Sequence, residues 1–264
     1  MENDLFVILG AGFGSRLLPY TQDVPKPLVT VCGSNLLSRT LKSAILAGIP
    51  RDNILIATGH CADAYLPYKL RTVFNPIYTK SNMLASLYFM DNFAKYERVI
   101  VHYGDTVFSP ITLKNLVQSE EKNVVVSDKY FLNYWKKRSE DYINDLETFI
   151  QDEKNNLVTL GEPVSNISDL MGQFTGLIKF SGNELFQCLE SARKKVMADI
   201  FLNWYMTDFI RYCINDQGIN FKVIETCDPW IEVDTVEDLH SSITHSRLIQ
   251  IDQALAFEVA NSIE

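Results

Sequence analysis

The chain has 264 residues, of which 47% are hydrophobic and 22% charged. These values are ordinary for a folded globular protein and exclude an intrinsically disordered or collagen-like chain. The formal net charge of −9 argues against nucleic-acid binding, because that affinity comes mainly from Lys and Arg on phosphates. Small phosphates remain candidate ligands, since backbone amides, a metal ion and a few cations can bind them.

The cysteines are odd in number, and no two of them form a Cys-x-x-Cys pair. They are Cys32, Cys61, Cys188, Cys213 and Cys227. This usage predicts free thiols in a reducing compartment. The N-terminal residues are acidic and lack the basic region of a secretory signal, and no apolar run reaches the ~18–20 residues that span a bilayer. The sequence therefore predicts a cytoplasmic protein without a membrane partner.

Strand-like and helix-like segments alternate through the first half of the chain. Short apolar runs predict strands, and apolar residues at helical spacing predict helices. The predicted strands cover residues 5–9, 53–58, 72–74, 98–102 and 123–127, and the predicted helices 35–47, 82–93 and 111–120. Such alternation predicts an α/β fold with a mostly parallel sheet and helices on both faces.

The pattern changes after about residue 128. Strands are predicted at 147–151, 157–160, 176–180, 220–226 and 230–234, and helices at 183–197, at 203–215 and from Glu237 onward. We expect one domain over residues 1–239, which includes a β-rich lobe at about 129–182. Residues 240–264 are predicted to form a helical extension. Whether this extension caps the domain or pairs with a second subunit in a homodimer is left open by the sequence.

A glycine-rich turn follows the first predicted strand and leads to a lysine between two prolines. It contains Gly10, Gly12, Gly14 and Arg16, and Pro25-Lys26-Pro27 follows. Ser15 stands where a dinucleotide fingerprint needs its third glycine, and the Gly-Lys-Ser/Thr of a P-loop is absent. Small residues let backbone amides approach a nucleotide, and an arginine fork can hold phosphates. The string therefore predicts a nucleotide site rather than a solvated loop.

This string resembles the signature of nucleotidyltransferases that couple an NTP to a sugar phosphate or a phospho-alcohol, Gly-x-Gly-x-x-Arg followed by Pro-Lys-Pro. Further segments resemble the cytidylyltransferase branch, which acts on phosphocholine, 2-aminoethylphosphonate and similar phospho-amines. They are Asn75-Pro76, Tyr103-Gly104-Asp105 and residues 82–87, 135–138, 145–148, 172–177 and 230–239. The resemblance spans residues 5–239 and implies a Rossmann-like, GT-A-like sheet with an inserted acceptor lobe.

Two aspartates, Asp105 and Asp234, each end a predicted strand. The strand ends of a parallel sheet meet at one edge, where open α/β sheets bind ligands. Mg²⁺ prefers one or two carboxylates together with phosphate oxygens and water. Both aspartates are therefore candidate ligands of a Mg²⁺ cofactor. Glu232 alternates with Asp234 on the same strand, and a supporting role or simple solvation are both open for it.

The resemblance implies transfer of CMP from CTP to a phospho- or phosphono-amine or -alcohol, with release of pyrophosphate. It places such an enzyme in cell-surface polysaccharide or phosphonate biosynthesis. Lys26 and Arg16 are the expected catalytic residues. The expected nucleotide-binding residues are Leu9, Ala11, Gly12, Gly14, Ser86 and Asp105. An acceptor ammonium would stack on aromatic rings and need counter-charge, which makes candidates of Asp128, Trp135, Asp208 and Trp230, although core packing is the alternative for both tryptophans.

Two other functions are left open: a sugar-1-phosphate nucleotidyltransferase that uses UTP or dTTP, and a non-catalytic nucleotide-sensing domain. Gln173 stands where the cytidylyltransferase branch often has Glu, and Met83 where a second Asn is frequent. The acceptor and the geometry of that loop are therefore open. The four histidines have no metal-ligand spacing and are interpreted as structural. The cluster Lys136-Lys137-Arg138 is interpreted as a solvated loop.

Overall fold

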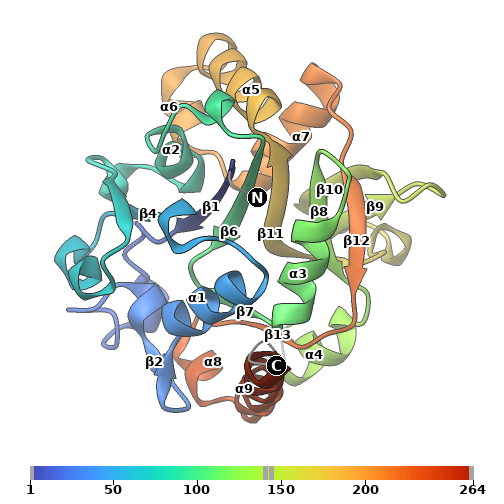
Figure 1. Ribbon diagram of the computed structural model, residues 1–264. Helices are drawn as coiled ribbons and strands as arrows, with labels where there is room; N and C mark the ends of the chain where they lie inside the picture. Colours follow the sequence, from blue (N-terminus) through green and yellow to red (C-terminus); the bar gives the residue numbers. More distant parts are fainter. Residues whose placement is uncertain (1–2, 139–141, 143–145, 262–264) are drawn as a thin grey trace.

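The computed structural model describes residues 3–138, 142 and 146–261. A seven-stranded sheet with the order β12-β8-β11-β6-β1-β4-β5 forms its centre (Figure 1). The strands are β1 (Asp4–Leu9), β4 (Ile54–Thr58), β5 (Arg71–Phe74), β6 (Arg98–Tyr103), β8 (Val124–Asp128), β11 (Gln173–Ser181) and β12 (Lys222–Thr226). Only β11 runs antiparallel to its neighbours in this sheet. The mostly parallel α/β architecture predicted from the sequence is thereby confirmed.

Helices cover both faces of the sheet, which is why its inner strands read as continuous apolar runs. One face packs against α2 (Met83–Tyr88), α5 (Gly182–Lys195), α6 (Ala198–Asn203) and α7 (Met206–Gln217). The other face packs against α1 (Leu36–Leu46), α3 (Pro110–Gln118) and α4 (Phe131–Arg138). The helix expected over residues 82–93 ends at Tyr88.

The segment expected as one C-terminal helix consists of α8 (Val236–His240) and α9 (Ser242–Asn261), and residues 262–264 lie outside the described part. Leu248, Ile251 and Leu255 of α9 are buried in a cluster that includes residues of β7 (Thr106–Phe108) and β13 (Trp230–Glu232). In addition, the fully buried Arg39 of α1 donates two hydrogen bonds of 2.8 Å to the Asp252 carboxylate on α9. This helix therefore packs on the domain along one face.

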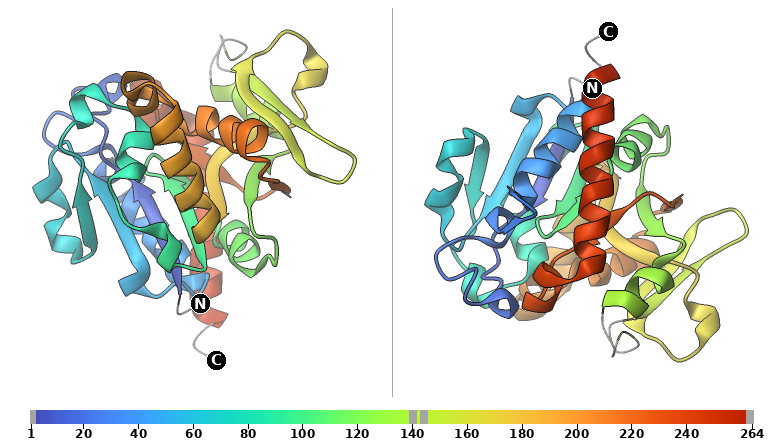
Figure 2. Two further views of the ribbon diagram at one scale, coloured as in Figure 1. Left: turned by 90° about the horizontal axis from the view of Figure 1, so that it is seen from above. Right: turned by 90° about the horizontal axis from the view of Figure 1, so that it is seen from below.

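The β-rich lobe is smaller than the expected range 129–182. It consists of the antiparallel pair β9 (Glu147–Gln151) and β10 (Leu157–Pro163), and Figure 2 shows this hairpin projecting from the body of the molecule. By contrast, β11 lies inside the central sheet between β6 and β8. The expectation is corrected because Leu177, Ile178 and Phe180 are buried on both faces of β11, as a central strand requires. A two-stranded sheet of β2 (Thr30–Val31) and β3 (Ser34–Asn35) completes the strands.

Within the described residues, no helix combines the length and the apolar character that crossing a membrane would need.

Candidate active site

A cavity of about 920 Å³ opens beside the carboxyl ends of β1 and β6. Its wall combines the turn after β1, the start of α2, the end of α4, the hairpin residue Glu147, and the segment from Glu232 to Asp238. Open α/β sheets bind ligands at this edge because their loops converge there. The fold thus brings these five parts of the chain, which are distant in sequence, to one pocket.

The turn after β1 is held close to the end of β6. The backbone carbonyl of Leu9 accepts a 3.1 Å hydrogen bond from Gly104, and that of Ala11 accepts one of 3.1 Å from His60. A side chain at Gly104 would come within 2.6 Å of the Leu9 oxygen. Gly14 has φ 67°, in the left-handed region that favours glycine. The turn can therefore follow this path only with small residues at these positions.

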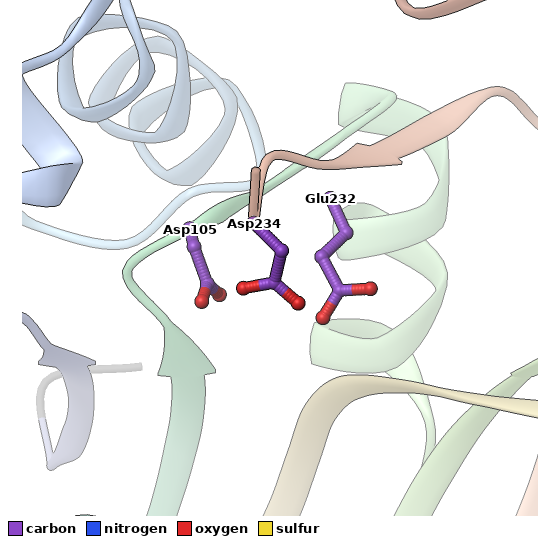
Figure 3. A group of neighbouring side chains, drawn as sticks. All are labelled: Asp105, Glu232 and Asp234. Carbon is purple, nitrogen blue, oxygen red and sulfur yellow. The ribbon is translucent and has the colours of Figure 1, made fainter. Parts of the chain in front are cut away.

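Three carboxylates, those of Asp105, Glu232 and Asp234, point in the same direction (Figure 3), and all three residues line the cavity. One oxygen from each lies within 4.8 Å of the others. Oδ1 of Asp105 is buried and has no hydrogen-bond partner in the described part of the chain. Oxygen ligands of this kind suit a hard divalent cation, and an orphaned carboxylate oxygen is what such an ion would satisfy. The donor set therefore fits Mg²⁺.

Two cations contact these carboxylates. Nζ of Lys26 lies 2.6 Å from Oδ2 of Asp105 and also donates to Oδ1 of Asp234. Arg16 approaches Asp234 at 3.2 Å, but its side chain is 68% exposed. Burial alone would lower the pKa of Lys26, and the two carboxylates outweigh it and raise that pKa. Lys26 is thus a charged ammonium fixed between the candidate metal ligands, whereas Arg16 has room to move.

The ionisation of two carboxyl groups is shifted in opposite directions. Burial, together with the negative charge of Asp234, raises the pKa of Glu232. Burial would also raise the pKa of Asp234, but Lys26, Arg16 and Arg138 lower it. The cluster therefore holds its charge unevenly, with Asp234 as the anion that the cations stabilise most.

Arg138 contradicts the interpretation of residues 136–138 as a solvated loop. It ends α4, and its side chain is only 9% exposed. Its guanidinium pairs with Glu232 at 2.8 Å and with both oxygens of Asp238 at 2.7 and 2.9 Å. It also lies 5.1 Å from the centre of the Trp135 ring. The spacing of Trp135 and Arg138, three residues apart in a helix, was the available signal that they share a face.

The residues expected to bind the nucleotide all line this one cavity: Leu9, Ala11, Gly12, Gly14, Ser86 and Asp105. Ser86 comes from α2, is 6% exposed, and its Oγ accepts a 3.0 Å hydrogen bond from Asn75. A Cβ at Gly12 would meet no atom within 4 Å, so the backbone there faces open space. The structure gives these residues a shared pocket, and their roles stay predictions.

Two of the residues expected to bind the acceptor are core residues instead. Trp230 is 1% and Asp128 is 3% exposed, and the Trp230 indole donates a 2.8 Å hydrogen bond to Asp128. The Trp230 ring stacks on Phe108 at 6.0 Å between centroids, and Arg247 approaches Asp128 at 3.8 Å. This pair satisfies itself in the interior, and neither residue lines the cavity among the described residues.

Asp208 does not line the cavity among the described residues, and its carboxylate stabilises the start of α7. It accepts a 2.9 Å hydrogen bond from the Tyr205 backbone amide and pairs with Arg211 at 2.5 Å. Trp135 does line the cavity, and so does Tyr205, another aromatic residue that could stack on an acceptor ammonium. Glu147, which was not proposed for the acceptor, lines it as well. Burial, foremost, raises the pKa of Glu147. Of the segment 145–148 that carried part of the resemblance, Asp145 lies outside the described residues.

A glycine turn, a fixed lysine and three carboxylates at the carboxyl edge of a mostly parallel sheet define an α/β nucleotide-binding protein. Residues 6–159, more than half of the chain, match the MobA-like NTP transferase domain. The chain belongs to this family of nucleotidyltransferases.

Known proteins resemble the chain over nearly its whole length. The CTP:phosphoglutamine cytidylyltransferase of Campylobacter jejuni is 29% identical over 90% of this chain and 98% of its own. The inositol-1-phosphate CTP transferase of T. maritima superposes with a TM-score of 0.72 and 18% identity, covering 95% of this chain and 96% of the other. The CTP:phosphocholine cytidylyltransferase of Streptococcus pneumoniae gives 0.68 and 18%, covering 92% and 99%. The two structural likenesses confirm the fold.

Proposed function

We propose that this protein transfers CMP from CTP to a small phosphorylated or phosphonate acceptor that carries an amine or alcohol, and releases pyrophosphate. The observation that carries the proposal is the meeting of Lys26, Asp105 and Asp234 in a cavity walled by the glycine turn. The C. jejuni relative and both structural neighbours are named for reactions of CTP. This agreement supports CTP as the nucleotide.

The proposed reaction needs no protein nucleophile, because the acceptor phosphate is already anionic. One of its oxygens attacks the α-phosphorus, and the bond to the pyrophosphate oxygen breaks as the new bond forms. Catalysis then consists of positioning the reactants and neutralising charge. Lys26 supplies a fixed positive charge at the reacting phosphates, and the exposed Arg16 is free to bind the leaving pyrophosphate. Backbone amides of the glycine turn approach the triphosphate.

Asp105, Glu232 and Asp234 are the residues that would hold Mg²⁺. An ion bound there would supply further positive charge to the phosphate oxygens. The carboxylates fix its place, and Lys26 and Arg16 keep the local charge from becoming too negative for a polyphosphate to enter. The acceptor side of the cavity offers Glu147, Trp135 and Tyr205 to an amine-bearing group.

The setting of the reaction is also proposed. The five thiols of the chain are free, in keeping with a reducing cytoplasm where CTP is made. The partners are small molecules, CTP and the acceptor. Assembly as a homodimer is a separate expectation that a sedimentation measurement would test.

A panel of substrates tests the proposal. Purified protein with Mg²⁺ is incubated with each of CTP, UTP, dTTP, GTP and ATP, against phosphocholine, 2-aminoethylphosphonate and glucose-1-phosphate. We expect pyrophosphate release with CTP and a phospho-amine. Release only with glucose-1-phosphate and UTP or dTTP would replace the proposal with the sugar-phosphate alternative. Silence over a broadened panel of phospho-acceptors would indicate a non-catalytic nucleotide-binding protein.

A further inference from the structure

We propose that Arg138 is a positioning residue that sets the orientation of Glu232 and Asp234 for binding a divalent metal ion. The inference rests on the metal-binding part of the proposed function. Arg138 ends α4, almost a hundred positions before Glu232 and Asp234 in the sequence. From the sequence alone it was interpreted as a solvated residue. The evidence is a set of contacts that join α4 to the end of β13 and the start of α8.

All three nitrogens of the Arg138 guanidinium donate hydrogen bonds to carboxylates. Nε and Nη2 bond the two oxygens of Asp238 at 2.7 and 2.9 Å, and Nη1 bonds Glu232 at 2.8 Å. A bidentate Arg–carboxylate pair of this kind is both strong and geometrically specific. The guanidinium carbon also lies over the Trp135 ring, 5.1 Å from its centre, which is a cation–π contact that further restrains it. Glu232 thus has its direction set by a buried fork.

Asp238 connects Arg138 to the backbone of Asp234. Its Oδ2 accepts hydrogen bonds from the backbone amides of Asp234 at 2.8 Å and Thr235 at 3.0 Å. In return, Thr235 Oγ1 accepts from the Asp238 amide, which completes the capping box at the start of α8. The backbone on which Asp234 sits is therefore tied, through one carboxylate, to the Arg138 fork. Outer groups of this kind orient metal ligands in general.

Arg138 is held more firmly than Arg16, which also lies beside the carboxylates. Among the residues that the structure describes, Arg16 makes one ion pair, and its side chain is 68% exposed, so it can turn toward a phosphate. Arg138 is 9% exposed, and its bonds to Glu232 and Asp238 would have to break before it could do so. Its nearest approach to Asp234 is 3.7 Å, outside hydrogen-bond distance. It therefore acts through the carboxylates rather than on the substrate.

Charge and geometry predict opposite results when Arg138 is replaced, and this makes the proposal testable. Removing a positive charge beside three carboxylates strengthens the attraction for a cation, so a purely electrostatic role predicts tighter metal binding in Arg138→Gln. A positioning role predicts weaker binding, because Glu232 and Asp234 lose their common support. Arg138→Lys keeps the charge but not the fork, and only a positioning role weakens metal binding there.

The experiment titrates Mn²⁺ into each protein without nucleotide and follows the EPR signal of the free ion. The variants are Arg138→Lys, Arg138→Gln and Asp238→Asn, the last of which breaks the same link from its other end. The matched control is Arg98→Lys, because Arg98 forms a bidentate pair with Asp4 at 2.8 and 2.7 Å that does not involve the cavity. Circular dichroism of each variant checks that it is folded like the unsubstituted protein.

We expect the Mn²⁺ dissociation constant to rise about 10–100-fold in Arg138→Gln and Asp238→Asn, the usual cost of losing an outer support. It should rise by a smaller factor in Arg138→Lys and change less than about twofold in Arg98→Lys. Equal or tighter binding in Arg138→Gln, or loss of binding in Arg98→Lys to the same degree, overturns the inference. Absence of Mn²⁺ binding in the unsubstituted protein overturns the metal site as well. Normal Mn²⁺ binding without pyrophosphate release would count against the proposed reaction and leave this inference standing.

Discussion

Nζ of Lys26 lies 2.6 Å from Oδ2 of Asp105, a residue on a different loop and 79 positions further along the chain. The same ammonium contacts Asp234, so one cation joins the signature loop to both aspartates expected to hold a metal. This arrangement means that the cation and the metal ligands belong to one charge-balanced group. Changing either partner is therefore expected to affect the same reaction in different ways.

Replacing Lys26 by alanine should lower kcat by about 10²–10³-fold, the usual effect of removing one preorganised charge from a transition state. Lys26→Arg should restore only part of the rate, because a planar fork does not replace a compact ammonium held between two prolines. Steady-state kinetics with CTP and the preferred acceptor measure both. Lys129→Ala is the matched control, since Lys129 forms an exposed ion pair with Glu225. A Lys26→Ala rate within a few-fold of the unsubstituted enzyme would refute the catalytic role.

Asp105→Ala should also lower kcat strongly, but by a different route. It removes a carboxylate of the metal cluster and leaves Lys26 paired with Asp234 alone. The Mg²⁺ concentration needed for half-maximal rate should therefore rise, whereas in Lys26→Ala it should not rise, because removing a cation beside the carboxylates does not weaken their attraction for Mg²⁺. A Mg²⁺ titration of the two variants separates the roles. The same Mg²⁺ dependence in both would contradict the assignment of Asp105 as a metal ligand.

Ser86→Ala should relax the choice between CTP and UTP more than it lowers turnover with CTP. The Ser86 hydroxyl is held by Asn75 at the edge of the cavity, and a site that hydrogen-bonds one base rejects an analogue lacking the matching group. The ratio of kcat/KM for the two nucleotides reports the effect. Ser43→Ala, at a buried serine that bonds the Phe108 carbonyl, is the control. An unchanged ratio in Ser86→Ala would remove Ser86 from the base site.

Trp230→Phe should reduce stability without affecting the acceptor. The substitution leaves the buried Asp128 without the indole N–H that it accepts, and such a loss costs about 1–3 kcal/mol of the free energy of unfolding. Urea denaturation measures this change, and acceptor KM should stay the same. A raised acceptor KM together with unchanged stability would indicate that Trp230 binds the acceptor and would contradict its assignment to the core.

His102 should make the protein less stable in mild acid. The residue is 2% exposed between Phe6 and Phe108, and burial lowers its pKa to about 3. Because the unfolded chain binds a proton near the ordinary pKa of 6.5, the free energy of unfolding falls as pH drops below 6.5. His102→Leu should flatten this slope between about pH 6.5 and 4.5. An unaltered slope would contradict a buried neutral imidazole.

The apolar pattern of the sequence predicted the strands well where each apolar run ends at a glycine or polar turn. Strands such as β1, β4 and β6 are short apolar runs that end at glycine or polar residues, and their helices carry apolar stripes at helical spacing. The pattern predicted a strand at residues 176–180 but placed it in the lobe, because an apolar run has the same pattern in a lobe as in a central sheet. The antiparallel place of β11 between β6 and β8 depends on contacts distant in sequence.

The site shows the same division. The meeting of the glycine turn, Lys26 and Asp105 at one cavity could be predicted, because a short motif or a strand end marks each of them. The buried pair of Asp128 and Trp230 could not, since a Trp and an Asp 102 positions apart carry no local sign that they satisfy each other. Arg138 was interpreted as part of a solvated loop because the helix α4 was not predicted and its carboxylate partners, Glu232 and Asp238, lie far along the chain.

The most direct test of the central claim is to follow which phosphorus of CTP reaches the acceptor. Purified protein is incubated with Mg²⁺, the best acceptor of the substrate panel, and CTP labelled with ³²P at either the α or the γ position. Nucleotidyl transfer predicts α-label in a product that contains the acceptor and γ-label in pyrophosphate alone. Transfer of γ-label to the acceptor, or retention of both labels in CTP, would contradict the account.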